Sequence, residues 1–198
     1  MIHRRLVGPA LAAALILAAC GGDPPPPPQP VGPTAEELEQ MRRDSIAAAE
    51  AAARAAAEAA AAAERERAAA EAAMREARAT LEEMVFFDYD ESALRADAEA
   101  VLRRKADILR ASPAVRIRIE GHADERGSTE YNIALGNARA EAVRQFFVSF
   151  GIDAGRFDMV SYGEERPLAM GSTESSWARN RRAEFVLTAG ADMINPGM

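Results

Sequence analysis

The stretch VRIRIEGHADERGSTEYN, residues 115–132, decides the fold, because it changes from a strand pattern to a helix pattern within a few residues. Val115, Ile117 and Ile119 alternate with polar residues, which is typical of a half-buried strand. A polar loop with two glycines follows, and a helical pattern begins near residue 129. The stretch therefore predicts a strand, a loop and a helix, and the loop either caps the helix or carries a binding site.

Patterns on either side of this stretch predict the rest of a small domain. Strands are expected at residues 84–87, 157–162 and 183–188, and helices at residues 92–111, 129–150 and around 177–181. Strands that alternate with helices indicate an α/β two-layer sandwich over residues 84–188. A right-handed crossover would place both long helices on one face of the sheet. Residues 189–198 are expected to form a flexible tail.

Residues 34–83 have a different composition, dominated by Ala and without Gly or Pro. Such a composition strongly favours a helix, and Thr34 with Glu37 forms a capping box at its start. Charged pairs such as Glu71 and Arg75 are spaced four residues apart, which supports a helical spacer of roughly 75 Å. Two interpretations stay open. A lone charged strut is favoured because few large apolar residues occupy coiled-coil core positions, and an alanine-seamed coiled coil is the alternative.

The N-terminal residues predict export and a lipid anchor. Residues 1–19 combine a basic start with a short apolar run, which is typical of a secretory signal peptide. The run ends in Leu-Ala-Ala-Cys20, which resembles the lipobox of bacterial lipoproteins, and Cys20 is the single cysteine of the sequence. The resemblance implies that lipid on Cys20 holds the chain in a bilayer, and Gly21 favours the outer membrane. Residues 20–33 then comprise the lipidated cysteine and a proline-rich linker, in which residues 24–33 are expected to form an extended spacer of roughly 30 Å.

Charge and residue usage argue against several classes of function. The formal net charge of -7 disfavours nucleic-acid binding, which needs a basic surface. Beyond the predicted signal peptide the one histidine is His122, and its neighbours in sequence offer only carboxylates, so no metal site is expected. Ser128, His122 and Asp124 crowd one short loop without a nucleophile-elbow pattern. We therefore expect neither an enzyme nor a cofactor.

The polar loop and the following helix offer one anion and one cation for binding. Asp124 lies in the loop, and Arg139 lies two to three turns into the helix. An aspartate and an arginine in one cleft suit a zwitterion, because Arg grips a carboxylate with two hydrogen bonds and Asp accepts from an ammonium. The alternatives are an internal Asp124–Arg139 ion pair, or Asp124 acting only as a turn former.

Four stretches carry a family resemblance. They are FFDYDESALRADA (86–98), GHADERGSTEYNIALGNARA (121–140), SYGEERP (161–167) and WARNRRAEF (177–185). Together they resemble the OmpA-like domain of peptidoglycan-associated lipoproteins, in the same order and over residues 84–188. The resemblance implies non-covalent binding of peptidoglycan through the diaminopimelate of its stem peptide, and an outer-membrane protein that faces the periplasm.

The resemblance also implies which residues bind. Asp124 and Arg139 match the family's key aspartate and arginine, and Asn132 and Leu135 match positions beside the pocket. Arg126 and Asp88 match further positions of the family at the edge of the pocket. Arg181 and Arg182 fall in the family's NRR element, where at least one is expected in an ion pair that holds the fold.

The long helical spacer departs from the short tether of typical members. It leaves the binding chemistry unchanged, but it weakens a direct transfer of the family's role in a Tol system, with its periplasmic partners and its part in cell division. The main hypothesis is a tether between the outer membrane and peptidoglycan. The alternative is a periplasmic protein-interaction platform whose helix oligomerises.

Overall fold

A computed structural model describes residues 32–197. Its elements in chain order are α1 (Ala35–Glu82), β1 (Val85–Phe86), α2 (Ala96–Ala111), β2 (Arg116–His122), α3 (Thr129–Ser149), the 3-10 turn η1 (Ala154–Arg156), β3 (Phe157–Gly163), α4 (Glu174–Asn180) and β4 (Arg182–Ala189). The predicted signal peptide, Cys20 and most of the proline-rich spacer lie outside the described residues. The predicted helices and strands are present with shifted ends. The largest shift is at α2, where Arg95 is still extended and the helix begins at Ala96.

Contacts divide the chain into two compact units, Met1–Ala53 and Arg54–Met198. In the first unit the capping box forms as predicted. The Thr34 amide donates to Glu37 Oε2 at 2.7 Å, and the Glu37 amide donates to Thr34 Oγ1 at 3.3 Å. Among residues 32–53, the large apolar side chains of Leu38, Met41 and Ile46 are each more than half exposed. Across residues 32–197, no helix combines the length and the apolar character needed to span a membrane.

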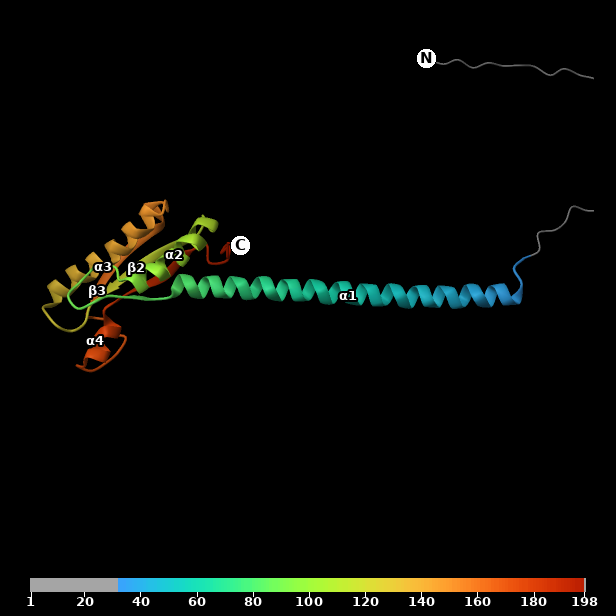
Figure 1. Ribbon diagram of the computed structural model, residues 1–198, viewed down its shortest axis with the longest axis horizontal. Helices are drawn as coiled ribbons and strands as arrows, with labels where there is room; N and C mark the ends of the chain where they lie inside the picture. The colour runs from blue at the N-terminus through green and yellow to red at the C-terminus, as the bar shows by residue number, and fades with distance from the viewer. Residues whose placement is uncertain (1–31, 198) are drawn as a thin grey trace, which may run out of the picture. The chain divides into compact units, whose positions relative to one another are not determined.

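The second unit contains one four-stranded sheet with the order β1-β4-β2-β3. Strand β4 pairs antiparallel with β1 and β2, and β2 pairs parallel with β3 through the α3 crossover. Helices α2 and α3 cover one face of the sheet (Figure 1). Ile117, Ile119 and Phe185 are buried together in the core. Arg118, which lies between the two isoleucines, points to the opposite face. The predicted two-layer α/β sandwich is confirmed.

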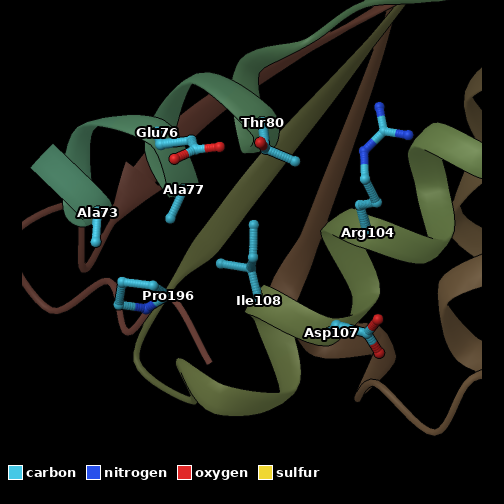
Figure 2. Close-up of a pocket in the computed structure, with 8 residues that line it drawn as sticks. All are labelled: Ala73, Glu76, Ala77, Thr80, Arg104, Asp107, Ile108 and Pro196. Carbon is cyan, nitrogen blue, oxygen red and sulfur yellow. The ribbon is translucent and has the colours of Figure 1, made fainter. Parts of the chain in front are cut away.

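The last turns of α1 belong to this core, although the domain was expected to begin at residue 84. Ala77 and Leu81 are buried among the core residues. The amine of Lys105, on α2, donates to the Leu81 carbonyl at 2.7 Å and to the Glu83 carbonyl at 2.5 Å. Such bonds satisfy carbonyls at a helix C-terminus that have no partner within the helix. Figure 2 shows Ala77 and Ile108 on the two sides of a shallow pocket of about 320 Å³ between α1 and α2.

The C-terminal residues pack against the domain, which corrects the expected flexible tail. Ile194 is buried in the core. The Asn195 amide donates to Ser112 Oγ at 2.8 Å, and the Ser112 hydroxyl donates back to the Asn195 carbonyl at 3.2 Å. Gly190 adopts a positive φ of 70°, which turns the chain beside the backbone of Ala114. An isolated apolar residue in a polar tail gives too weak a pattern for this docking to be predicted.

Candidate functional site

The candidate site is built where β2 ends and α3 begins. Two glycines let these elements approach closely, because a Cβ on Gly121 would overlap the carbonyl oxygen of Gly136. The parallel register between β2 and β3 shifts after Gly121, and such irregularities re-aim side chains beside functional sites. Ser128 then caps α3, its side chain accepting from the Tyr131 amide at 3.2 Å. Helix α3 is therefore fixed against the polar loop, and Arg139 is carried beneath it.

Asp124 is buried in the loop and holds two arginines. Arg126 binds both carboxylate oxygens, with Nη2 to Oδ2 at 2.6 Å and Nε to Oδ1 at 3.1 Å. Arg181 Nη1 donates to Oδ2 at 3.3 Å. Burial raises the pKa of Asp124, but the hydrogen bonds from Arg126 and Arg181 outweigh it and leave the pKa below its usual value. The carboxylate is therefore charged at neutral pH.

Arg139 is fully buried and donates to three backbone carbonyls, two from the segment between β1 and α2 and one from the last residue of β2. Its Nε donates to Glu91 at 2.8 Å, its Nη1 to His122 at 2.8 Å and its Nη2 to Asp88 at 3.1 Å. Burial lowers the pKa of Arg139 to about 10, and the negative charge of Asp124 opposes that shift. The side chain therefore stays charged at neutral pH, close enough to Asp124 to respond to its charge.

The internal ion pair between Asp124 and Arg139, left open by the sequence, is not the arrangement found. Within residues 32–197, Asp124 pairs with Arg126 and Arg181, and Arg139 donates to carbonyls. A guanidinium has five N–H donors, so Arg139 retains one N–H on each terminal nitrogen beyond these three bonds. Two parallel N–H groups are the arrangement that grips a carboxylate.

Arg126 covers this pair of charges. Its guanidinium lies between two aromatic rings, 3.9 Å from the Tyr89 ring centre and 4.1 Å from that of Trp177. Its side chain is 28% exposed, whereas the Asp124 side chain is 5% exposed. Arg126 is thus an accessible cation paired with a buried carboxylate.

The remaining predicted residues surround the charges. Asn132 is buried and donates through its side-chain amide to Glu164. Leu135 is half-buried on the next turn of α3. The carboxylate of Asp88 is exposed and pairs with Arg95 at 3.4 Å, while its backbone carbonyl accepts from Arg139. Asp88 therefore contacts Arg139 through its backbone carbonyl and not through its carboxylate. The identity of the residue does not predict such a backbone contact.

The two arginines of the NRR element both form buried ion pairs. Arg181 bridges Asp124 and Glu174, the latter at 2.8 Å, and donates to the Phe87 carbonyl at 3.1 Å. Arg182 binds Glu184 Oε1 on the opposite face of the sheet, with its Nη2 at 2.5 Å and its Nε at 2.6 Å. The expectation that at least one of them holds the fold is confirmed. Arg181 also fixes the orientation of the Asp124 carboxylate.

His122 lies outside the Asp124 site, on the face of the sheet away from α2 and α3. It is 1% exposed, and within the described chain neither ring nitrogen has a hydrogen-bond partner. Burial, and then the charge of Arg182, lower the pKa of His122 to about 4, so the ring is neutral. From the sequence, only residues close to His122 in the chain could be considered as its neighbours. The sheet also brings Glu184 beside it, from strand β4.

Several residues that shape the site have only weak signals in the sequence. Trp177 and Tyr89 enclose Arg126, and Glu174 pairs with both Arg126 and Arg181. These residues come from segments far apart in the chain, so spacing could not group them. The available signal was that the single tryptophan lies in a polar segment, where an aromatic ring often serves a contact.

Comparisons with known proteins place these residues in a family. Residues 86–181 match the model of the OmpA family. The peptidoglycan-associated lipoprotein of Brucella melitensis is 50% identical over 103 residues, which cover 52% of this chain and 61% of the relative. That of Pseudomonas aeruginosa is 48% identical over 100 residues, which cover 50% of this chain and 59% of the relative. The chain thus covers less than two thirds of either relative.

Solved structures give the same fold. The peptidoglycan-associated lipoprotein of Burkholderia pseudomallei is 43% identical, with a TM-score of 0.52, over 53% of this chain and 89% of that one. The C-terminal domain of Helicobacter pylori MotB is 21% identical, with a TM-score of 0.51, over 56% of this chain and 87% of that one. The second likeness concerns the fold alone.

Proposed function

The chain belongs to the OmpA family through residues 86–181, and on this basis we propose that it binds peptidoglycan without covalent attachment. The recognised group is the diaminopimelate of the stem peptide, which carries an ammonium and a carboxylate on one carbon. The names of the relatives described above, peptidoglycan-associated lipoproteins, support peptidoglycan as the polymer that is bound. The role is binding, without a chemical step.

The observation that carries this proposal is the buried pair of opposite charges at Asp124 and Arg139. Asp124 is held by two arginines, one of which is a half-exposed side chain that a ligand ammonium would replace. Arg139 retains two N–H groups after its three carbonyl bonds. Because charge-assisted hydrogen bonds contribute about 1.5–3 kcal/mol each, the two contacts together give a modest single-site affinity.

Pull-down of the full chain with purified sacculi tests the proposed site. Asp124→Asn and Arg139→Lys each keep the size of the side chain roughly constant, and each is expected to lower retention by about tenfold or more. Asp97→Asn, an exposed aspartate of α2, is the matched control and is expected to bind normally. Full retention by the Asp124→Asn, Arg139→Lys double variant, with an unchanged melting temperature, would show that binding lies elsewhere.

Competition with free small molecules tests the recognised group. Diaminopimelate and cadaverine have the same two amines at the same spacing, but cadaverine lacks both carboxylates, so the pair separates recognition of the zwitterion from binding of any amine. Free diaminopimelate is expected to release the full chain from sacculi, and cadaverine at the same concentration is expected to release much less. Equal release by both would exclude recognition of the zwitterion.

We extend the proposal to a lipid anchor, which would make the chain a tether between outer membrane and cell wall. The lipobox at Cys20 supports it, and stable anchoring requires more than one acyl chain. Attachment to a membrane raises the effective concentration at the polymer, which offsets modest single-site affinity. Incorporation of labelled palmitate into the full chain, and its loss in Cys20→Ala, is the expected result.

A second candidate is a periplasmic interaction platform in which α1 oligomerises and the domain docks a partner of the Tol type. The observation in its favour is the exposure of Leu38, Met41 and Ile46, each above 50%. Self-association would remove these side chains from water. Analytical ultracentrifugation of the full chain in detergent separates the two candidates. Oligomers that dissociate in a Leu38→Ser, Met41→Ser, Ile46→Ser variant would favour the platform.

A further inference from the structure

The outer face of the sheet, opposite α2 and α3, carries a second cluster of polar groups. Glu120 and Glu184 lie directly opposite each other on neighbouring strands β2 and β4. Like charges in that position destabilise a sheet. His122 follows two residues after Glu120 on the same face, so three ligand-bearing side chains meet there. Their ligand atoms all lie within 4.8 Å of one another.

The histidine of this cluster is buried without a hydrogen-bond partner. His122 is 1% exposed, and its Nε2 lies 3.8 Å from Glu184 Oε1, too far for a hydrogen bond. A buried imidazole with two unsatisfied nitrogens is costly, because its polar atoms lose water and gain nothing. The ring faces two carboxylates, which is the arrangement a bound cation would satisfy.

We propose that Glu120, His122 and Glu184 bind a divalent transition-metal ion of the zinc type. One neutral imidazole and two carboxylates are common ligands for zinc, with bonds of roughly 2.0–2.2 Å. Tetrahedral ligands at those bond lengths lie roughly 3.3 Å apart, so small side-chain rotations close the cluster around an ion. A water molecule completes the coordination. The site is distinct from the Asp124 site and does not depend on the proposed function.

Neighbouring arginines set the strength of this site. Arg118 binds Glu120 Oε1 at 2.8 Å, and Arg182 binds Glu184 Oε1 at 2.6 Å. Each arginine binds only the Oε1 atom of its glutamate, so the Oε2 atom of each carboxylate is left for an ion. Arg166, stacked on the Tyr162 ring, adds a third positive charge that His122 senses. These charges weaken cation binding. Arg182 is buried, but the Arg118 side chain is 40% exposed and is free to turn toward water.

The ion would join β2 to β4 directly beneath the polar loop. The carbonyl of His122 accepts from Arg139 Nη1 at 2.8 Å, so the metal would brace one of the three carbonyls that position that arginine. An ion would enter past Glu184, the most exposed residue of the cluster, and past the neighbouring Arg118. An ion held in this way would have a structural role, because it would join two neighbouring strands.

Zinc titration of the full chain, followed by NMR of the His122 ring and by calorimetry, tests the proposal. His3 and Cys20 offer further zinc ligands, so the ring signals of His122 itself are observed. We expect those signals to shift with one equivalent of zinc and the melting temperature to rise. His122→Gln and Glu184→Gln are expected to weaken this binding by about tenfold or more.

Arg118→Gln is the decisive variant, because it removes a competing charge without removing a ligand. It is expected to tighten zinc binding by roughly tenfold. Arg116→Gln, two residues earlier on the same face of β2, removes an equal charge outside the cluster and is expected to change little. His122 ring signals that stay unchanged at saturating zinc would overturn the proposal. So would an Arg118→Gln variant that binds no more tightly than Arg116→Gln.

Discussion

Arg126 Nη2 lies 2.6 Å from Asp124 Oδ2, so the protein supplies its own cation to the carboxylate proposed for the ligand ammonium. The same guanidinium is enclosed by Tyr89 and Trp177, which hold it over the site. An internal cation keeps the buried carboxylate satisfied while no ligand is present, which avoids the cost of an unpaired buried charge. Binding then exchanges one cation for another.

Replacement of Arg126 is expected to change the rate of binding. In Arg126→Gln, the more exposed of the two guanidinium groups on Asp124 no longer has to leave before a ligand reaches it, so a diaminopimelate-containing peptide should associate several-fold faster. Stopped-flow fluorescence of Trp177, the single tryptophan, provides the measurement. Arg179→Gln removes the same charge from an exposed position and is the control. Equal association rates for the two variants would contradict the exchange.

The close contact of β2 with α3 predicts a large effect from one methyl group. In Gly121→Ala the added Cβ would overlap the carbonyl oxygen of Gly136, which is backbone and cannot turn aside. Helix α3 must then move away from β2, and Arg139, one turn after Gly136, moves with it. We expect a loss of about 1–3 kcal/mol in the free energy of unfolding, and weaker retention on sacculi.

Urea unfolding and sacculus pull-down of the same Gly121→Ala protein measure these two effects. Gly32→Ala is the control, because its Cβ would meet nothing within 4 Å. A Gly121→Ala protein as stable as the Gly32→Ala control would show that the backbone accommodates the methyl group and that the close approach is unimportant.

The fold was predicted where the signal is local, and the site was predicted only in part. Alternation at Ile117 and Ile119 revealed β2, because every second residue of a half-buried strand faces the core. Asp124 and Arg139 were matched to one binding site. The partners that hold them could not be predicted, because Arg181 and the carbonyl of Glu91 arrive from segments whose approach depends on the whole fold.

The contacts of Lys105 also could not be predicted from the sequence. It occupies the apolar stripe of α2, between Leu102 and Ile108, yet a lysine on such a stripe usually extends its amine to water. Its amine instead meets the end of α1, and the Leu81 and Glu83 carbonyls accept from it. That contact depends on where α1 ends, which the uniform Ala-rich composition does not specify.

The buried Lys105 predicts how stability changes with pH. Burial lowers the pKa of Lys105 to about 6, against 10.5 for a free lysine side chain. Between these values the unfolded chain binds a proton that the folded chain does not, so this residue makes the unfolding free energy rise with pH. The slope is at most about 1.4 kcal/mol per pH unit.

Lys105→Met isolates this contribution. Urea unfolding of the full chain and of the variant at several values from pH 6 to pH 9 gives the difference in unfolding free energy. That difference, native minus variant, is expected to increase with pH, because other titrating groups are common to both proteins. A constant difference would show that Lys105 keeps its proton in the fold, stabilised by the two carbonyls.

Leu81 tests whether the end of α1 is part of the domain. Its side chain is fully buried in the core, together with Ala77 one turn earlier. Leu81→Ala removes buried apolar atoms and leaves a cavity, so the domain should lose about 2–5 kcal/mol of unfolding free energy. Leu168→Ala, the same change at a leucine 39% exposed, should cost less than about 0.5 kcal/mol. Thermal and urea unfolding monitored by Trp177 fluorescence measure both. If both variants unfold like the unmodified chain, α1 ends outside the core and the domain begins at β1. If only Leu81→Ala is less stable, the last turns of α1 and the domain share one cooperative core.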